Sequence, residues 1–385
     1  MKIFPGWIFA SIVWCTIQTE AFAEWEVVPS PNLTAQANEL YSVAAAGDKD
    51  VWAVGTGYDQ QLGAYRTVTE HWDGVNWSIV PSPNASNGYN MLNGVAVVAP
   101  NDVWVVGQAS NGNTYNTLIE HRTNLISAKR SGWSIVPSPN IAGSSNVLTA
   151  ITALAPDNIW AVGYSTDSSF NNYSLSMHWN GSTWTIIPTP TVEGDFLFSV
   201  AAVASNDVWA VGKSRPIYSN ARSLTLHWNG MVWTNVPSPN PSAYSNSLWG
   251  VAAIAANDVW AVGAAGSSQT LAIHWNGAAW TVAPPAPLGG NASNEALIGI
   301  VALSNNNIWT SGAFYQTGTE QTLTERWDGS NWTVVSSPNL PSSSNRIQGI
   351  TVTPNGTLWA VGTTGPFGQP EQTLILLQRP EQSVQ

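Results

Sequence analysis

Histidine is the residue type in this chain with the clearest capacity for chemistry, because imidazole binds metals and exchanges protons near neutral pH. The chain contains five histidines. They occupy one position of a short recurring phrase, as in "HWNG", at His71, His121, His178, His227 and His274. Arg326 and Leu377 take that position in two further copies. Whether the histidines can meet at a metal ion depends on the fold that positions them.

Other reactive arrangements are missing from the sequence. There is no His-Glu-x-x-His motif, no Gly-x-Ser-x-Gly turn, no phosphate-binding loop and no cysteine paired with histidine. Six carboxylates fall in segments expected to be loops, and no spacing singles out a catalytic pair among them. They are Asp59, Asp167, Glu193, Asp195, Glu295 and Glu320. We therefore predict no catalytic residue, no metal and no cofactor, and we favour a protein that is not an enzyme.

The first 23 residues are typical of a secretory signal peptide, with an apolar run at Ile8–Cys15 and an Ala-x-Ala end. We expect cleavage before Glu24. Trp14 precedes the single cysteine, Cys15, where a lipoprotein would have a small residue, so release is favoured over lipid anchoring. These features predict a secreted protein, extracellular or periplasmic, that is not inserted in a membrane after cleavage.

The charge balance narrows the class of partner. The formal net charge is -11, and charged residues make up only 9% of the chain. An acidic chain without a basic run argues against binding to nucleic acid or to anionic membranes. A surface that is polar mainly through amides and hydroxyls suits an extracellular protein, and we expect a monomer.

One phrase repeats along the chain, most clearly at Leu248–Val282 ("LWGVAAIAANDVWAVG…TLAIHWNGAAWTV"). Its central tryptophan recurs seven times, at intervals of about 50 residues, the size of a four-stranded propeller blade. The seven are Trp52, Trp104, Trp160, Trp209, Trp260, Trp309 and Trp359. The sequence therefore predicts an all-β, seven-bladed β-propeller of four-stranded antiparallel blades.

The strands of a blade follow from turn signals. Leu248–Ile254 exemplifies the first strand, "DVWAVG" the second and Thr270–Trp275 the third. Asn-Gly or Asp-Gly then marks a hairpin into a fourth strand. The seventh repeat ends at Arg379-Pro380 without a fourth strand, whereas the mature chain would begin with one at Trp25–Val28. We predict that this N-terminal strand completes the last blade and closes the ring, in one domain over residues 24–380, with 381–385 as a short tail.

These repeats resemble kelch-like propellers and, more closely, the tryptophan-rich "WAVG/HWNG" proteins that bacteria secrete. The resemblance is carried in the first blade by Trp52, Gly55, His71-Trp72, Gly74 and Trp77, and by their counterparts in the others. It implies the fold and leaves the activity open. Kelch-like oxidases need a cysteine-modified tyrosine, which the mature chain lacks, and sialidase-type Asp-boxes differ in their spacing.

The fold decides how the repeated residues are used. Equivalent positions in successive blades are spread around a ring, so we predict that each histidine bonds to a neighbouring strand or loop and binds no metal. The repeated tryptophans could stack on sugars, but their regularity favours packing between blades.

The positions that vary are more informative. The loops that join second to third strands, and fourth strands to the next blade, are long and open on one face of the propeller, here called the long-loop face. The turns that join first to second strands and third to fourth strands are short and lie on the other face, here called the short-turn face. Ligand contacts are expected on the long-loop face. One position near the start of each first strand does not repeat. These rim residues are Tyr41, Asn93, Thr149, Phe198, Trp249, Ile298 and Gln348. Tyr41, Asn93, Phe198, Trp249 and Gln348 are our candidate ligand contacts at the channel mouth, although uneven packing would also explain the variation.

Two further features lie near the rim. A polar residue stands three positions before each rim residue, and we expect it to bond to the backbone of its turn. These are Asn38, Asn90, Asn146, Asp195, Asn246, Glu295 and Asn345. The loop "KSRPIYSNAR" gathers Lys213, Arg215 and Arg222 around Tyr218. Arg215, Tyr218 and Arg222 could receive a carboxylate or an acidic sugar, although a solvated loop with three scattered charges is the simpler explanation.

The sequence thus predicts a secreted binding module that recognises a glycan or a protein on its long-loop face. A polysaccharide hydrolase or lyase using loop carboxylates, and a structural surface or adhesion component, are the alternatives.

Overall fold

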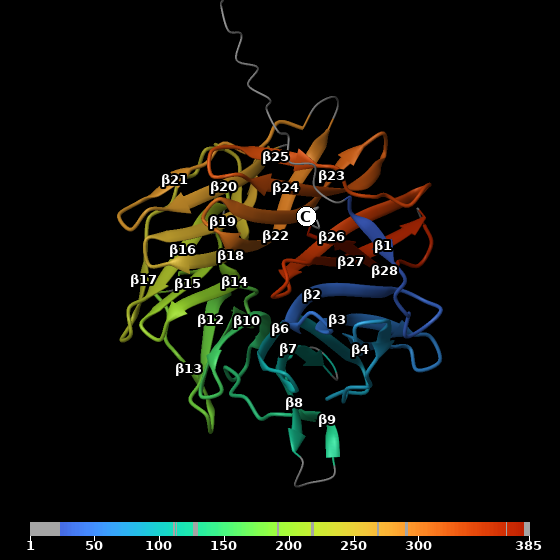
Figure 1. Cartoon of the computed structure of the whole chain (residues 1–385). Coiled ribbons are helices and arrows are strands. Elements are labelled where there is room, and N and C mark those ends of the chain that lie inside the picture. Colours follow the sequence, from blue (N-terminus) through green and yellow to red (C-terminus); the bar gives the residue numbers. More distant parts are fainter. Residues whose placement is uncertain are drawn as a thin grey trace, which may run out of the picture.

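The computed structural model describes residues 24–380, apart from residues 111, 113, 126–129, 191, 217–218, 268, 289–291 and 367. The predicted leader and the 381–385 tail lie outside the described residues. Seven four-stranded antiparallel sheets stand around a central axis in chain order (Figure 1). The predicted seven-bladed propeller is confirmed. No helix long and apolar enough to cross a membrane occurs among the described residues.

Each blade is an antiparallel meander whose first strand is innermost, because the first strands of neighbouring blades contact one another around the ring. Blades 1 to 4 comprise β2 (Asn38–Gly47), β3 (Asp50–Asp59), β4 (Ala64–Trp72) and β5 (Trp77–Ile79); β6 (Tyr89–Ala99), β7 (Asp102–Ser110), β8 (Asn116–Leu125) and β9 (Arg130–Ile135); β10 (Ser145–Ala155), β11 (Asn158–Thr166), β12 (Asn172–Trp179) and β13 (Trp184–Ile186); and β14 (Asp195–Ala204), β15 (Asp207–Ser214), β16 (Arg222–Trp228) and β17 (Trp233–Asn235). Blades 5 to 7 comprise β18 (Asn246–Ala255), β19 (Asp258–Ala265), β20 (Gln269–Trp275) and β21 (Trp280–Val282); β22 (Ser293–Ser304), β23 (Asn307–Gln316), β24 (Thr319–Trp327) and β25 (Trp332–Val335); and β26 (Ser343–Val352), β27 (Leu358–Pro366), β28 (Gln372–Gln378) and β1 (Glu26–Val28).

Strand β1 closes the ring as predicted. It pairs antiparallel with β28 as the outermost strand of blade 7, with Val27 opposite Leu376. An ion pair of 2.5 Å joins Glu26 to Arg379 at the end of the ladder. The first and last segments of the described chain therefore share one sheet, and Figure 1 shows β1 (blue) beside β28 (red).

The repeated tryptophans fill the spaces between blades. The tryptophan of each second strand meets the fourth-strand tryptophan of the next blade edge to face, with centroids 5.3–6.1 Å apart. The seven pairs are Trp52–Trp133, Trp104–Trp184, Trp160–Trp233, Trp209–Trp280, Trp260–Trp332, Trp309–Trp25 and Trp359–Trp77. Edge-to-face contacts between large aromatic rings stabilise the packing beyond the effect of burying their apolar surface. The prediction that these columns pack the blades is confirmed.

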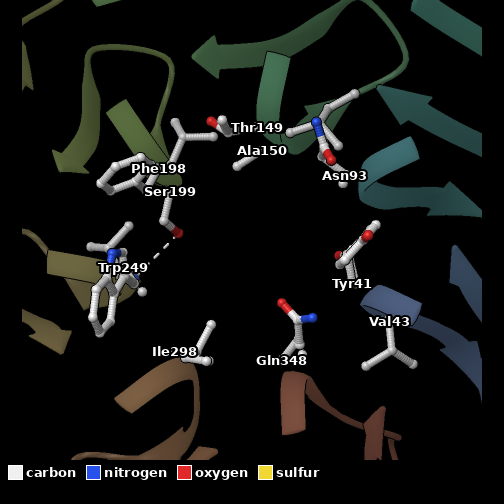
Figure 2. A pocket seen from close by; sticks show the side chains of 18 of the residues that line it. Tyr41, Val43, Asn93, Thr149, Ala150, Phe198, Ser199, Trp249, Ile298 and Gln348 are labelled. Atoms are coloured by element: carbon white, nitrogen blue, oxygen red, sulfur yellow. Dashed lines mark hydrogen bonds between the residues drawn. The ribbon is translucent and has the colours of Figure 1, made fainter. Parts of the chain in front are cut away.

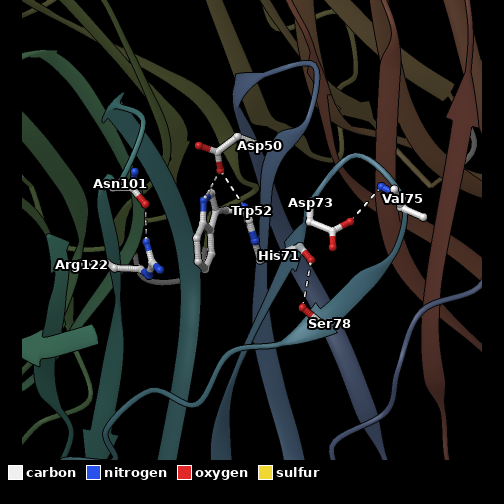
Figure 3. Close-up of polar contacts among 8 residues, drawn as sticks. All are labelled: Asp50, Trp52, His71, Asp73, Val75, Ser78, Asn101 and Arg122. Atoms are coloured by element: carbon white, nitrogen blue, oxygen red, sulfur yellow. Dashed lines mark hydrogen bonds and ion pairs between the residues drawn. The ribbon is translucent and has the colours of Figure 1, made fainter. Parts of the chain in front are cut away.

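The five histidines support this packing. Each Nε2–H donates to an Asp or Asn side chain at the start of the second strand, and in blade 1 His71 Nε2 lies 2.8 Å from Asp50 Oδ1 while its ring stacks on Trp52 (Figure 3). The other pairs are His121–Asp102, His178–Asn158, His227–Asp207 and His274–Asp258. These pairs are separated around the ring, near the short-turn ends of the blades. They bond to a neighbouring strand, as predicted, although they are partly exposed.

Blade 2 departs from the pattern in its outer strands. Its fourth strand begins at Arg130, before the predicted start at Trp133, and β8 extends to Leu125. Arg122 replaces the third-strand tryptophan found in five other blades, and its guanidinium lies 4.7 Å from the Trp52 ring (Figure 3). A cation over an indole face thus substitutes for the usual contact between rings.

In five blades a Ser-Pro-Asn segment follows the fourth strand and continues the sheet through its side chains. The segments are 30–32, 82–84, 138–140, 238–240 and 337–339. In blade 1, Thr67 N–H donates to Asn84 Oδ1 over 3.0 Å, and the hydroxyls of Ser82 and Thr67 are 2.9 Å apart. In blade 7, Thr373 N–H donates to Asn32 Oδ1 over 3.1 Å. Proline has no N–H for a ladder, so these serine and asparagine side chains satisfy the third strand at the blade's outer edge.

Candidate functional site

A bulge in each first strand positions the rim residue. In blade 5, Leu248 is opposite Gly263 and Gly250 is opposite Val262, so Trp249 between them has no partner in the ladder. The same shift in register occurs in all seven blades, at each rim residue. A bulge leaves one residue unpaired and redirects its side chain. The seven rim residues, which do not repeat, are therefore the ones that the backbone turns out of the ladder at this bulge.

The rim residues converge on one cavity of about 480 Å³ at the axis (Figure 2). The structure thus brings together the five rim candidates Tyr41, Asn93, Phe198, Trp249 and Gln348, together with the other two rim residues. A second tier below them is built from glycine, alanine and serine, and a third from valine and isoleucine. Small residues are required in the second tier because the backbones of neighbouring blades lie close together there. A Cβ on Gly250 would lie 2.7 Å from the carbonyl oxygen of Ile298 in the next blade.

Two of the polar rim side chains already hold neighbouring blades together. Asn93 Nδ2 donates to the carbonyl oxygen of Leu148 over 2.7 Å, and Thr149 Oγ1 donates to that of Leu197 over 2.9 Å. Asn93 also bonds to Gln108, whose side chain lines the cavity. The side-chain amide of Asn93 therefore already bonds to the propeller itself, and fewer of its hydrogen-bonding groups remain for a ligand than its position at the rim suggests.

Tyr41 is held by a carboxylate outside the cavity. Its hydroxyl donates to Glu39 Oε2 over 2.7 Å. Burial, followed by the charge and hydrogen bond of Glu39, raises the pKa of Tyr41 far above its usual range. Tyr41 thus remains a neutral phenol with a fixed ring, suited to contact and hydrogen bonding rather than to proton transfer.

The side of the mouth at blades 3 and 4 is aromatic and carries a lysine. Phe196 contacts Tyr164 of blade 3 with ring centroids 4.9 Å apart, and its ring lies 6.0 Å from that of Phe198. Lys213 Nζ lies 5.0 Å from the Phe196 centroid and 5.6 Å from that of Phe198. Burial, followed by the charge of Arg215, lowers the pKa of Lys213.

The predicted basic cluster does not gather at one point. Lys213 pairs with Ser223 and Arg222 with Ser214 in the β15–β16 ladder, so the two basic side chains point to opposite faces of blade 4. Arg222 lines a separate outer hollow with Ser219 and Asn220. Arg222 is therefore directed away from Lys213, because side chains alternate along a strand, and its role as a ligand contact stays a prediction. Arg215 is exposed, and Tyr218 lies outside the described residues.

The polar column before the rim has the structural role expected of it. Asn38, for example, accepts a hydrogen bond from Thr34 N–H over 3.1 Å and donates to the carbonyl oxygens of Thr34 and Gln36. Asn90, Asn146, Asp195, Asn246 and Asn345 accept equivalent bonds from their own turns. Glu295 differs, since burial raises its pKa while the nearby Thr270 backbone of blade 5 favours its ionised form.

The carboxylates named from the sequence do not meet at the mouth. The described lining of the cavity contains no Asp, Glu, His, Lys or Arg. Glu320 pairs instead with Arg346 over 2.6 Å, and Asp195 is buried in its own turn. Among the described residues, no group of three or more His, Cys, Asp or Glu is arranged to hold a metal ion.

Three buried glutamates were missed by the sequence interpretation. Glu70, Glu120 and Glu325 are each fully buried between blades, and none of their carboxyl oxygens has a hydrogen-bond partner in the described part of the chain. Burial raises the pKa of each to about 8, although Ser82 near Glu120 and the Ala286 backbone near Glu325 favour the ionised form. The sequence did indicate that this position is buried, because the other four blades have an apolar residue there. These residues are Met177, Leu226, Ile273 and Leu376.

Comparison with known proteins supports the fold. No protein-family model matches the chain, and no curated protein sequence does. Among solved structures, YCF48 bound to D1 peptide is similar with a TM-score of 0.55 and 15% identity, over 94% of this chain and all of that one. Chaetomium thermophilum Sqt1 bound to the N-terminus of ribosomal protein L10 has a TM-score of 0.50 and 9% identity, over 90% of this chain and 98% of that one. A Trypanosoma rangeli sialidase in complex with sialic acid has a TM-score of 0.50 and 10% identity, over 92% of this chain but 58% of that one. At such identities the likeness extends to the propeller fold and not to activity.

Proposed function

We propose that this propeller is a binding module that holds a polypeptide segment over the channel mouth of its long-loop face. The observation that carries the proposal is the set of bulged rim residues, which differ from blade to blade and which meet at one cavity. Phe198, Trp249 and Tyr41 supply rigid aromatic contact area, and Gln348 supplies an amide. Tyrosine and tryptophan are favoured at protein interfaces because they give large contacts at low entropic cost.

A polypeptide is favoured over a glycan by the lining and by the comparisons. Five of the seven rim residues are apolar or already hydrogen-bonded within the protein, so few groups remain to satisfy the many hydroxyls of a sugar chain. They are Phe198, Ile298, Tyr41, Asn93 and Thr149. Two propellers of similar fold are described as bound to a peptide or to a protein terminus. A hydrolase or lyase receives no support, since the described lining contains no carboxylate.

The test is selection from a displayed library of twelve-residue peptides, followed by fluorescence polarisation with the enriched peptides. Trp249→Ala and Phe198→Ala should each weaken binding by about tenfold or more, as truncation of central aromatic contacts does. Met231→Ala removes a side chain that is 78% exposed, on the short-turn face, and should change nothing. Enriched peptides that bind both rim variants as tightly as wild type would place the site elsewhere. A glycan array that gives the only rim-dependent binding would replace the polypeptide with a sugar.

The proposal includes a location outside the cytoplasm, together with membership of the secreted tryptophan-rich propellers. The signal-peptide pattern of residues 1–23 and the surface rich in amides and hydroxyls motivate it. Expression with the leader, followed by fractionation and N-terminal sequencing, should give a released chain beginning at Glu24. An uncleaved chain in the cytoplasm would contradict this.

A further inference from the structure

Lys213 is an unpaired cation at the edge of the channel mouth. It lies on β15 directly opposite Phe196 of β14, so both side chains project from the same face of blade 4, toward Tyr164 of blade 3. Its stem is half-buried, and its ammonium group sits over the rings of Phe196 and Phe198. Within the described part of the chain, the ammonium group of Lys213 makes no ion pair or hydrogen bond.

The surroundings of this ammonium group favour an anion. Burial and the nearby Arg215 both act against the charge of Lys213, and no carboxylate of the described chain acts on its pKa in the opposite direction. Contact with two aromatic faces compensates only part of the lost hydration. A ligand carboxylate beside Nζ would supply the missing partner in a half-buried setting, where charged hydrogen bonds are stronger than in water.

The charges around the mouth also orient such a ligand. On the side of blades 1 and 7, Glu39 and Glu371 are close enough that each affects the pKa of Tyr41, and the two carboxylates repel one another. Arg346 is on that side too, but it is paired with Glu320. An anionic group is therefore disfavoured there and attracted to the blade 4 side. Complementary potentials of this kind set the direction in which a partner docks.

The groups next to Lys213 restrict the class of ligand. Phe196 and Phe198 have no hydrogen-bonding atoms in their side chains, and Trp249 continues the apolar wall in blade 5. A carboxylated sugar would stack its C–H face on these rings, but the hydroxyls at its edges would find no polar partner in the side chains of Phe196 and Phe198. A peptide acid flanked by apolar side chains leaves no such group unsatisfied.

A row of tyrosines extends the same surface across blades 1 and 2. Ring centroids of consecutive members are 5.1–5.3 Å apart in the row Tyr58, Tyr65, Tyr89 and Tyr115. Tyr164 of blade 3 and Phe196 of blade 4 form the next ring contact around the mouth. Aromatic side chains therefore lie near the long-loop ends of four consecutive blades, 1 to 4.

We infer that the partner is an acidic and apolar segment of polypeptide, whose carboxylate pairs with Lys213 while flanking apolar side chains pack on Phe196, Phe198 and Trp249. This inference rests on the proposed function and specifies the ligand of that site. It replaces Arg222, which lies on the other face of the blade, with Lys213 as the anion-binding residue.

The experiment is a double-mutant cycle on the strongest binder from the twelve-residue library and its Glu→Gln or Asp→Asn analogue. For wild type, the acidic peptide should bind about tenfold more tightly than its amide analogue, a typical coupling for a close charge pair. Lys213→Met keeps the apolar stem and should bind both peptides with the weaker affinity, whereas Lys213→Arg should restore most of the difference. Lys49→Met is the matched control, since it removes one exposed positive charge from the short-turn face. Melting temperatures establish that the variants are folded.

Each outcome decides the question. Enriched peptides that lack an acid, or a Lys213→Met protein that still distinguishes the two peptides, would overturn the inference while leaving a polypeptide site that depends on Trp249 intact. A library that yields no binder dependent on Trp249 or Phe198 would overturn the proposed function and this inference with it. If glucuronate-bearing or sialylated saccharides bind in a manner dependent on Lys213 and peptides do not, the carboxylate belongs to a sugar and the polypeptide partner is wrong.

Discussion

The three buried glutamates predict that this protein loses stability as the pH rises. Glu70, Glu120 and Glu325 have pKa values of about 8 in the folded state, against 4.5 as the ordinary value. A group whose pKa is raised by folding contributes its full stability below the unfolded pKa and loses it as the pH rises through the folded pKa. The loss therefore falls between about pH 4.5 and pH 8, and the protein should be most stable in mild acid.

The magnitude follows from the interval between the unfolded pKa and the pH of the measurement. At pH 7 that interval is about 2.5 units, and each unit corresponds to ~1.4 kcal/mol, so each glutamate costs roughly 3 kcal/mol relative to pH 4.5. Glutamine has the same shape as a protonated glutamate and cannot ionise. Each Glu→Gln substitution should therefore remove one such cost. For a domain of roughly 360 residues, this raises the melting temperature at pH 7 by about 4 °C per site.

The assay is thermal unfolding, followed by tryptophan fluorescence from pH 4.5 to 8.5, for wild type, the three single Glu→Gln variants and the triple variant. The melting temperatures should agree near pH 4.5 and diverge as the pH rises, and the triple variant should show the flattest profile. Glu24→Gln, at an exposed position, controls for the loss of a surface charge. Parallel profiles for wild type and the triple variant would mean that the carboxyls are ionised and hydrated in the folded protein, contrary to the burial seen here.

The remaining predictions concern the stability of the propeller fold. Deleting residues 24–28 removes the strand that closes blade 7, and it should lower the melting temperature far more than deleting residues 381–385; equal losses would refute closure through β1. Gly263→Ala would place a Cβ 1.9 Å from a backbone oxygen of β18, so it should cost several kcal/mol or abolish folding, as overpacking at a rigid backbone does. Gly47→Ala meets nothing within 4 Å and should leave chemical denaturation unchanged; similar losses in both variants would contradict the steric argument.

The fold followed from the sequence because its information is repeated seven times. Each copy of the tryptophan phrase carries the same strand and turn signals, and the missing fourth strand at one end matched the extra strand at the other. The rim column was found because it varies against a constant frame. The direction of Lys213 could not be found in this way, since the pairing register of β15 and β16 decides which face a residue occupies.

The buried glutamates show where pattern reasoning failed. Glu70 stands beside His71 in a third strand, and its burial was not predicted although the four blades without a glutamate have an apolar residue there. Burial of a carboxyl without a partner is unfavourable enough that sequence rules exclude it. Such violations concentrate at sites where a protein gives up stability for another property.

The invariant glycine of the "WAVG" phrase and the variable rim residue both result from the same bulge in the first strand. At Gly263 the carbonyl of the first strand approaches so closely that no side chain fits. This approach lies at the point where the first strand bulges and Trp249 leaves the ladder. A residue outside the ladder makes no strand pair, so the position can change from tryptophan to glutamine without disturbing the blade. A frame that repeats strictly thus produces a ring of seven positions that are free to differ, and for this physical reason specificity should depend on the rim and on Lys213 beside it.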